Sequence, residues 1–191
     1  MHTVPQPIFT MADAKTHGVR KDQVYKLLKE GSLERVGRGV FIKPSAIDLR
    51  FIPLAAATAV RPKATLCLTS ALVYHDLSDI IPYGSDIALP RGTRYPTGIA
   101  HAIWHSFDTD TFEIGRTELP NNAGLDWYVY SPIRCIIDMF RLKHLEGEEA
   151  AIKTLKLWLA KPGNSAGTLF EMARHFPKAQ TSLRRALEVL L

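Results

Sequence analysis

Residues 9–43 narrow the possible folds more than any other part of the sequence, because helix signals alternate there with turn glycines. Thr10 can cap a short helix that runs through Lys15, since a hydroxyl at this position satisfies free backbone N–H groups. His17-Gly18-Val19 follows as a turn, in which Gly18 adopts a positive φ without strain. The stretch therefore begins as a helix and a tight turn.

A second helix is predicted from about Arg20 to Glu30. Val24, Leu27 and Leu28 stand at i, i+3 and i+4, which is the spacing of one buried stripe. Gly31 ends this helix, as a glycine after the last turn commonly does.

Two short strands are predicted next, at residues 33–36 and 40–42, with Gly37-Arg38-Gly39 as the hairpin loop. Helix, turn, helix and hairpin in this order predict a winged helix-turn-helix, in which the hairpin is the wing. Arg38 is expected at the tip of the wing, with little to pack against.

The second helix of such a unit fits the major groove of B-DNA, and its N-terminal end faces the base edges. The wing arginines would lie near the backbone or the minor groove. The predicted DNA-contacting residues are Arg20, Lys21, Gln23, Tyr25, Lys26, Lys29, Arg35 and Arg38. The alternative is a solvated helix pair whose lysines form only a charged face. The turn glycine, the apolar stripe, the Gly-Arg-Gly loop and the charge together favour DNA.

The positive charge is concentrated at the N-terminal end. The chain of 191 residues has a net charge of +5 and a pI near 9.3. Residues 1–43 hold eight Lys and Arg against four Asp and Glu, a net charge of +4. Such a local excess attracts polyanions. A membrane surface is disfavoured, because the helix lacks a broad apolar face.

Composition indicates a cytoplasmic protein of one or two domains with a substantial core, since 46% of the residues are hydrophobic. Cys67 and Cys135 lie in apolar runs and are interpreted as buried small hydrophobes rather than a disulfide. Residues 1–9 show no pattern of an export signal. The longest apolar run, residues 52–60, is far shorter than the roughly 20 residues of a membrane helix.

The remainder is predicted to form a second domain. Pro44 and Pro53 mark a boundary, so the expected domains are 1–48 and 49–191. Helices are expected at 53–60 and 69–75, the latter capped by Thr69 or Ser70. Short β-rich segments, expected to form a mostly antiparallel sheet, are residues 86–89, 100–107, 111–114 and 127–130, with an exposed basic loop at 90–96.

The chain then turns helical. Ser131 and Pro132 form a cap and a first helical position, and Ile133, Ile136, Ile137 and Phe140 share one face. Further helices are expected at 148–159, around Leu169, Ala173 and Phe176, and around Leu183, Leu187 and Leu191. The fold class is therefore α+β: a winged helix-turn-helix followed by a small sheet packed with helices.

No catalytic site, metal site or cofactor is predicted. His101 and His105 lie on one side of a probable strand, but a zinc site needs more ligands, and they are interpreted as residues of a solvated face. His75 ends a helix, where a cation is favoured. Cys135 has no adjacent histidine. Arg134 and Asp138 are expected to pair at i, i+4, and Glu146, Glu148 and Glu149 to begin a helix.

The sequence resembles the AbiEi family of antitoxins, the transcription-regulating half of type IV toxin–antitoxin pairs. The matching segments are Val19-Arg20-Lys21 with Tyr25-Lys26-Leu27-Leu28, the hairpin from Leu33 to Phe41, Thr69-Ser70-Ala71-Leu72-Val73-Tyr74-His75-Asp76-Leu77, and Ser131-Pro132-Ile133-Arg134 with Asp138. Together these segments span nearly the whole chain. Arg20 departs from the pattern, since many N-terminal domains of this family have Ser where the second helix begins.

The resemblance implies a two-domain protein without enzymatic activity. Its N-terminal winged helix would bind operator DNA, inverted repeats in its own promoter, and repress the operon. Its C-terminal domain would neutralise a nucleotidyltransferase-like toxin. Direct contact with the toxin is not the assumed mechanism of the family, so no toxin interface is assigned.

Two other functions are compatible with the same pattern. One is an ordinary winged-helix repressor whose C-terminal domain senses a ligand. The other is a DNA-acting enzyme of restriction type, which the missing carboxylate cluster disfavours. The sequence does not separate the antitoxin from the ligand-sensing repressor.

Overall fold

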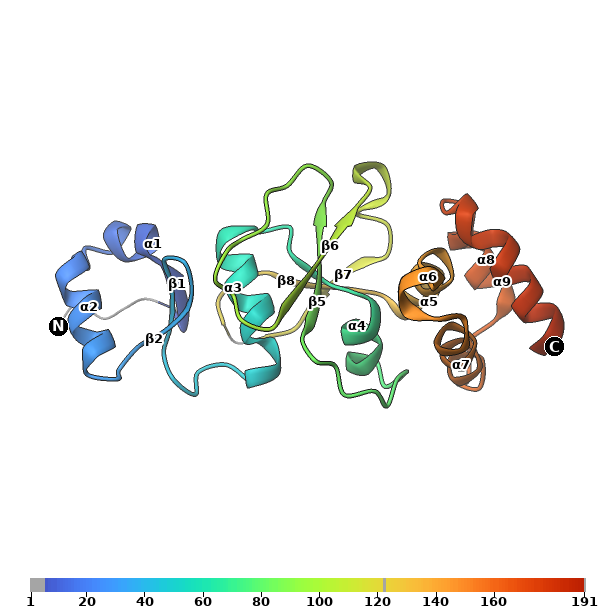
Figure 1. Cartoon of the computed structure of the whole chain (residues 1–191), viewed down its shortest axis with the longest axis horizontal. Helices are drawn as coiled ribbons and strands as arrows, with labels where there is room; N and C mark the ends of the chain where they lie inside the picture. Colours follow the sequence, from blue (N-terminus) through green and yellow to red (C-terminus); the bar gives the residue numbers. More distant parts are fainter. Residues whose placement is uncertain (1–5, 122, 191) are drawn as a thin grey trace.

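The computed structural model describes residues 6–121 and 123–190. The chain is elongated: a small N-terminal unit, a central sheet with helices and a C-terminal helical group follow one another along the long axis (Figure 1). We call residues 6–43 the head, and residues 44–121 and 123–190 the body. Residues 1–5, on which part of the export-signal prediction rests, lie outside the described residues.

The head contains the predicted order of helix, turn, helix and hairpin. Its elements are β1 (Ile8–Thr10), α1 (Met11–Thr16), α2 (Lys21–Lys29), β2 (Glu34–Gly37) and β3 (Val40–Ile42). The strands form an antiparallel sheet of order β1-β3-β2. The sequence did not predict β1. The hairpin loop is Arg38-Gly39, because Gly37 already pairs with Val40.

Local hydrogen bonds explain where the head helices begin. The Thr10 hydroxyl accepts a bond from the Asp13 N–H at 3.2 Å, and Asp13 Oδ2 accepts one from the Thr10 N–H at 2.7 Å. This reciprocal pair is a capping box. The Arg20 side chain does not cap α2; instead, the Gln23 Oε1 accepts the Arg20 N–H at 2.8 Å. Gln23 thus supplies only the reciprocal half of a capping box; the side-chain acceptor that a Ser would offer is absent, and the Gln23 N–H bonds to the Arg20 carbonyl instead.

The two faces of the head sheet pack against different partners, because alternate residues of a strand point to opposite sides. Phe9 and Phe41 pack with Val24 in a small core under α1 and α2. Ile8, Val40 and Ile42 belong to the main core and lie against α3 (Ile52–Val60) of the body. Head and body therefore share apolar contacts across residue 48, which stays a predicted domain boundary.

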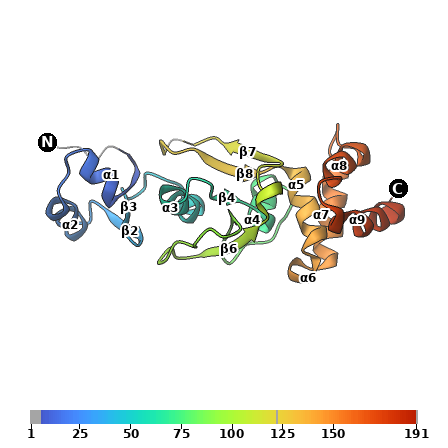
Figure 2. The same ribbon diagram turned by 90° about the horizontal axis from the view of Figure 1, so that it is seen from above.

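The body sheet is mixed rather than mostly antiparallel, which corrects the prediction. Its strands are β4 (Thr65–Leu66), β5 (Ser85–Pro90), β6 (Ala102–Phe107), β7 (Arg116–Leu119) and β8 (Trp127–Tyr130), in the order β6-β5-β4-β8-β7. Strands β5 and β6 are parallel, and so are β4 and β8, whereas β4–β5 and β7–β8 are antiparallel. Seen from above, β7 and β8 lie on one side of α3 and β6 on the other (Figure 2).

Two predicted elements of the body are wrong in detail. Residues 111–114 are not a strand: Asp108 caps the short helix η2 (Thr109–Thr111), and Phe112 then turns into the core. Helix α4 (Leu68–Tyr74) is preceded by Cys67, so Thr69 and Ser70 lie inside it rather than at its cap. A further short helix, η1 (Leu49–Phe51), leads into α3.

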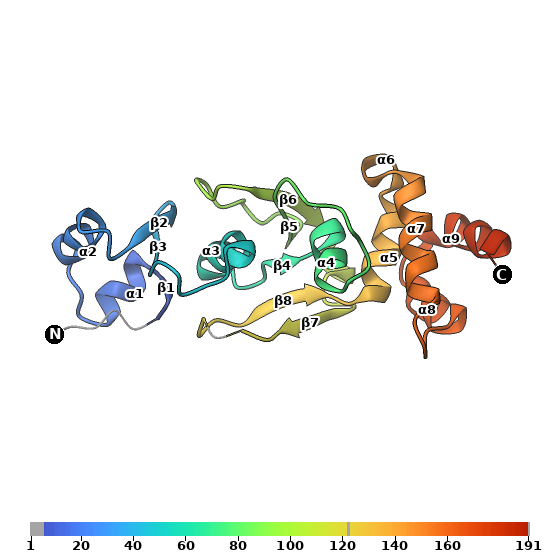
Figure 3. The ribbon, with the colours of Figure 1, turned by 90° about the horizontal axis from the view of Figure 1, so that it is seen from below.

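The C-terminal helices surround α5 (Pro132–Arg141), which contacts α4 and the helices that follow it. Ile136, Ile137 and Phe140 are buried, and Ile133 is half-buried. Figure 3 shows α5 at the point where the sheet region meets this helical group. The group contains α6 (Lys143–Glu146), α7 (Glu148–Leu159), α8 (Ala166–Ala173) and α9 (Pro177–Leu190). Leu191 lies outside the described residues.

Candidate nucleic-acid interface

The outer face of α2 carries a stripe of basic and aromatic side chains. Lys21, Tyr25 and Lys29 stand four residues apart and are exposed, so they share one face of the helix. The Lys21 Nζ lies 5.8 Å from the centre of the Tyr25 ring, and Tyr25 is 51% exposed. Figure 1 shows α2 at the outer end of the head, away from the body. Within the part of the chain that the structure describes, these three side chains are exposed to solvent.

Other predicted contact residues of α2 have interactions within the head. Arg20 Nη2 lies 3.2 Å from Asp22 Oδ2, and Lys26 Nζ lies 3.8 Å from Glu30 Oε1. Both pairs are exposed, and exposed pairs contribute little to stability, so a phosphate can compete for these cations. Gln23 is half-buried, and its carbonyl oxygen is bonded to the helix start.

The hairpin arginines lie on a different part of the head. Arg35 Nε donates to the Gly37 carbonyl at 3.2 Å, and the Arg38 N–H donates to the Thr97 carbonyl of the body at 3.2 Å. A Cβ at Gly37 would lie 3.1 Å from Ile99. The expectation of a wing tip with little to pack against is therefore wrong: the hairpin loop rests on the body.

Two arginines that were not among the predicted site residues adjoin Arg38. Arg38, Arg61 and Arg94 line a cleft of about 290 Å³, which we call the arginine cleft. Arg61 Nε donates to the Arg94 carbonyl at 3.1 Å, which holds the basic loop against the end of α3. Among the described residues that line this cleft, none is acidic. The exposed basic loop at 90–96 was the signal in the sequence that could have found it.

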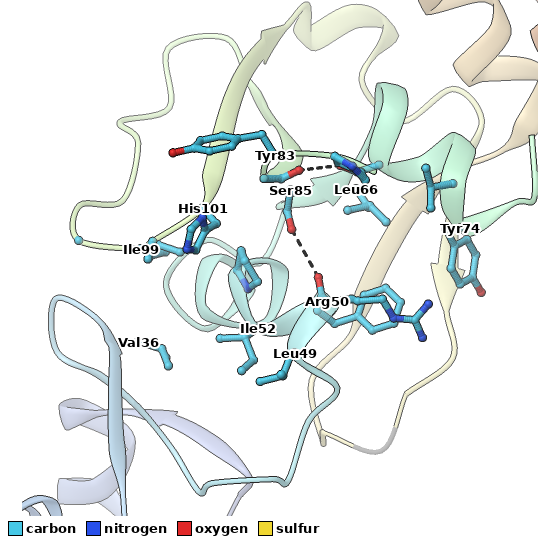
Figure 4. A pocket seen from close by; sticks show the side chains of 18 of the residues that line it. Val36, Leu49, Arg50, Ile52, Leu66, Tyr74, Tyr83, Ser85, Ile99 and His101 are labelled. Carbon is cyan, nitrogen blue, oxygen red and sulfur yellow. Dashed lines mark hydrogen bonds between the residues drawn. The ribbon is translucent and has the colours of Figure 1, made fainter. Parts of the chain in front are cut away.

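A larger and mostly apolar cavity of about 510 Å³ lies where the head meets the body, and we call it the junction cavity. Figure 4 shows Val36 on the head side and Ile52, Ile99 and His101 on the body side. The Ser85 hydroxyl donates to the Arg50 carbonyl at 3.4 Å beside it. The cavity is separate from the outer stripe of α2.

Ser70, Asp86 and His105 form a hydrogen-bonded network within the body. This network accounts for the three polar side chains without a catalytic role. The Ser70 hydroxyl lies 2.9 Å from Asp86 Oδ2, and His105 Nε2 lies 2.9 Å from Asp86 Oδ1. The carboxylate stands between the serine and the histidine, so the histidine is not placed to take a proton from that hydroxyl. His105 is thus largely buried and paired, which corrects its assignment to a solvated face.

The remaining predicted chemistry-bearing residues are dispersed. His101 is exposed and precedes β6. His75 Nε2 lies 2.8 Å from the Tyr130 carbonyl, and burial lowers the pKa of His75, so the expected cation at this helix end is not favoured. Burial raises the pKa of the Cys135 thiol well above its ordinary value. In the part of the chain that the structure describes, no three His, Cys, Asp or Glu side chains meet to hold a metal ion.

The Ser-Pro-x-Arg…Asp segment holds the body together. Ser131 caps α5, and Arg134 pairs with Asp138 at 2.9 Å, as predicted. Glu148 and Glu149 lie in the first turn of α7, while the side chain of Glu146 is outside the described part. Within residues 6–121 and 123–190, every helix is too short or too polar to cross a lipid bilayer.

The molecule is thus an α+β protein whose head presents a basic helix after a turn and rests its hairpin on the body. Residues 6–42 match the model of a family described as "Transcriptional regulator, AbiEi antitoxin". The match covers the head and ends with β3. A comparison with curated proteins found no match.

Proposed function

We propose that this protein is a DNA-binding transcriptional regulator and the antitoxin of a type IV toxin–antitoxin pair. The head acts as a winged helix-turn-helix that binds inverted repeats in its own promoter and represses the operon. The body neutralises a nucleotidyltransferase-like toxin, and no direct toxin interface is assigned.

The observation that supports this proposal most strongly is the family match at residues 6–42, which coincides with α1, α2 and the hairpin. The outer stripe of α2 has the charge and exposure that a major-groove helix requires. In this proposal Arg20, Lys21, Tyr25, Lys26 and Lys29 approach the DNA from α2. Gln23 contributes its side-chain NH2 group, because its side-chain oxygen already accepts the Arg20 N–H.

The hairpin arginines have a different part in the proposal. Arg35 and Arg38 bind the DNA backbone beside the body, and Arg61 and Arg94 of the arginine cleft extend the same basic surface. Phosphate contacts of this kind position a protein on DNA without reading its sequence.

The test is a binding titration with a labelled duplex that spans the region upstream of the reading frame. Replacing Lys21 and Lys26 together by alanine should weaken binding by at least about tenfold, since each lysine that neutralises a phosphate adds to affinity. Lys156→Ala is the matched control, because Lys156 is an exposed lysine on α7 in the body. Equal affinity of the double variant and the control would refute DNA binding by α2.

The antitoxin half is tested by survival under expression of the nucleotidyltransferase-like protein from the neighbouring reading frame. The double lysine variant should lose repression and retain rescue at matched protein levels. Ile136→Asp places a charge in the core of the body, where Ile136 is fully buried, and should abolish rescue. Loss of both activities in the lysine variant would show that one surface serves both.

The junction cavity favours a second candidate function, a repressor that responds to a small ligand. A mostly apolar cavity of about 510 Å³ has the size of a small-molecule site. A protein of this kind would fail to rescue cells from the neighbouring toxin while its DNA affinity still changed with a ligand.

A further inference from the structure

We propose that the junction cavity binds a small organic anion with a flat, apolar body, such as an aromatic carboxylate, and that its occupancy weakens DNA binding. The effect on DNA rests on the function proposed above, whereas binding of the anion does not. Three properties of the cavity support the assignment: its apolar walls, its charge and a strained wall segment.

The walls are apolar and come from both parts of the molecule. Ile52, Leu66 and Val73 face the cavity from the body, and Val36 from the head. At the mouth, Leu49 and Tyr83 are 81% and 90% exposed. Large apolar side chains gathered around an opening commonly mark a binding site. A ligand with an apolar body would cover them.

The charge of the lining selects an anion. Arg35, Arg50 and His101 line the cavity, and none of its described lining residues is acidic. Arg50 is paired with Asp48 at 2.7 Å. Arg35 bonds through Nε to the Gly37 carbonyl, and its terminal nitrogens have no partner among the described residues. A guanidinium offers two parallel N–H donors to a carboxylate or sulfonate, so Arg35 is the expected anchor.

One wall is held in an uncommon backbone conformation. His101 has a φ of 58°, which residues other than glycine rarely adopt. Its carbonyl accepts the Ser85 N–H at 2.6 Å, and a Cβ at Gly84 would lie only 2.5 Å from that oxygen. Strained segments of this kind cluster at ligand sites. The wall is therefore fixed by its neighbours before any ligand arrives.

The cavity is connected to the proposed DNA surface in two ways. Arg35 is a proposed phosphate contact, and a guanidinium bound to the carboxylate of a ligand is not free for DNA. Ile99 lines the cavity and packs on Gly37, and the neighbouring Thr97 holds the Arg38 N–H. Since such coupling is reciprocal, the ligand and DNA weaken each other's binding by the same factor.

The binding experiment uses anilinonaphthalene sulfonate, an aromatic anion, and phenylnaphthylamine, its uncharged counterpart. Val73→Trp and Ala100→Trp fill the cavity from two different walls. Ile81→Asp is the control, because Ile81 is 93% exposed and does not line the cavity. We expect one anion per chain and at least about tenfold weaker binding in both tryptophan variants. The control should bind as the wild type does, and the uncharged probe at least about tenfold more weakly.

Two results would refute the assignment of the junction cavity as an anion-binding site. Unchanged binding of the anion in both tryptophan variants would place the probe elsewhere, and equal affinity for the uncharged probe would remove the role of the charge. Melting curves of both variants show whether each is folded, and the two replacements disturb different segments.

The regulatory half is measured with the labelled promoter duplex. Saturating anilinonaphthalene sulfonate should raise the Kd for DNA at least about tenfold in the wild type and leave Ala100→Trp unaffected. An unchanged Kd for DNA in the presence of the bound anion would refute only the proposed effect on DNA binding. A chain that binds the anion in the cavity but no DNA at all would refute the proposed function together with its regulation, and leave the site standing.

Discussion

Replacing Asp138 by alanine should strongly destabilise the body, because it leaves the buried Arg134 guanidinium without a negative partner. The Arg134 side chain is 0% exposed, and its guanidinium lies between the Tyr130 and Phe176 rings, 4.3 and 4.4 Å from their centres. Asp138 is the carboxylate that neutralises it, at 2.9 Å. Removing one partner of a buried pair costs about 3–5 kcal/mol, a large part of the roughly 5–15 kcal/mol that stabilises a typical protein.

Urea unfolding followed by circular dichroism measures this loss. With a slope of about 2 kcal/mol per M, a loss of about 4 kcal/mol lowers the midpoint by about 2 M. Asp79→Ala is the matched control, since it removes an equally short but exposed pair with Lys153, and its midpoint should hardly move. Adding Arg134→Met to Asp138→Ala should recover part of the loss, because the fully buried charge is then gone and only Arg141, which pairs with the same carboxylate and is partly exposed, lacks its partner. A midpoint for Asp138→Ala equal to that of the control would refute the reasoning.

Three further expectations follow from the head and its contacts. Arg38→Ala should weaken DNA binding and reduce the log–log salt slope by about 0.9, the loss of one phosphate contact; an unchanged slope in titrations at several salt concentrations would exclude Arg38 from the interface. Burial lowers the pKa of His75 below its ordinary value of 6.5, so the unfolded chain takes up the proton first and stability falls as the pH drops below that value. Urea midpoints at about pH 5.5 and 7.5 should therefore differ less in His75→Gln than in the wild type. Ile42→Asp should separate head from body at a cost of several kcal/mol, because Ile42 is 1% exposed against α3; a melting curve equal to that of the wild type would contradict the shared core.

The elements that the sequence predicted correctly are those with local signals. The caps at Thr10 and Ser131, the stop at Gly31 and the apolar stripe of α5 each depend on residues within one or two turns. Helix α7 begins and ends at the predicted residues for the same reason. The pair of Arg134 and Asp138 was predictable because both stand on one helix.

The features that escaped prediction depend on distant partners. Strands β1 and β4 have three and two residues, too few to show an alternating pattern. The parallel pairing of β5 with β6 depends on the path of the loop between them, which periodicity does not encode. His105 finds its partner Asp86 on that neighbouring strand.

The candidate site, too, has one part that local sequence signals predict and another that depends on distant partners. The basic face of α2 follows from helical spacing alone. The contact of the hairpin with the body joins Arg38 to Thr97, and no local pattern of either segment indicates the other. The arginine cleft and the junction cavity were missed because both are assembled from segments of head and body.

The two-sided packing of the head sheet limits how this protein can be recombined with others. A head transplanted onto a foreign body would bring Ile8, Val40 and Ile42 with it and present them to whatever surface it met. Unless that surface offered a helix of small residues like α3, with its run Ala55-Ala56-Ala57, the chimera would expose an apolar patch that promotes aggregation. A graft of the head therefore has to extend through residue 60, so that α3 still covers these side chains.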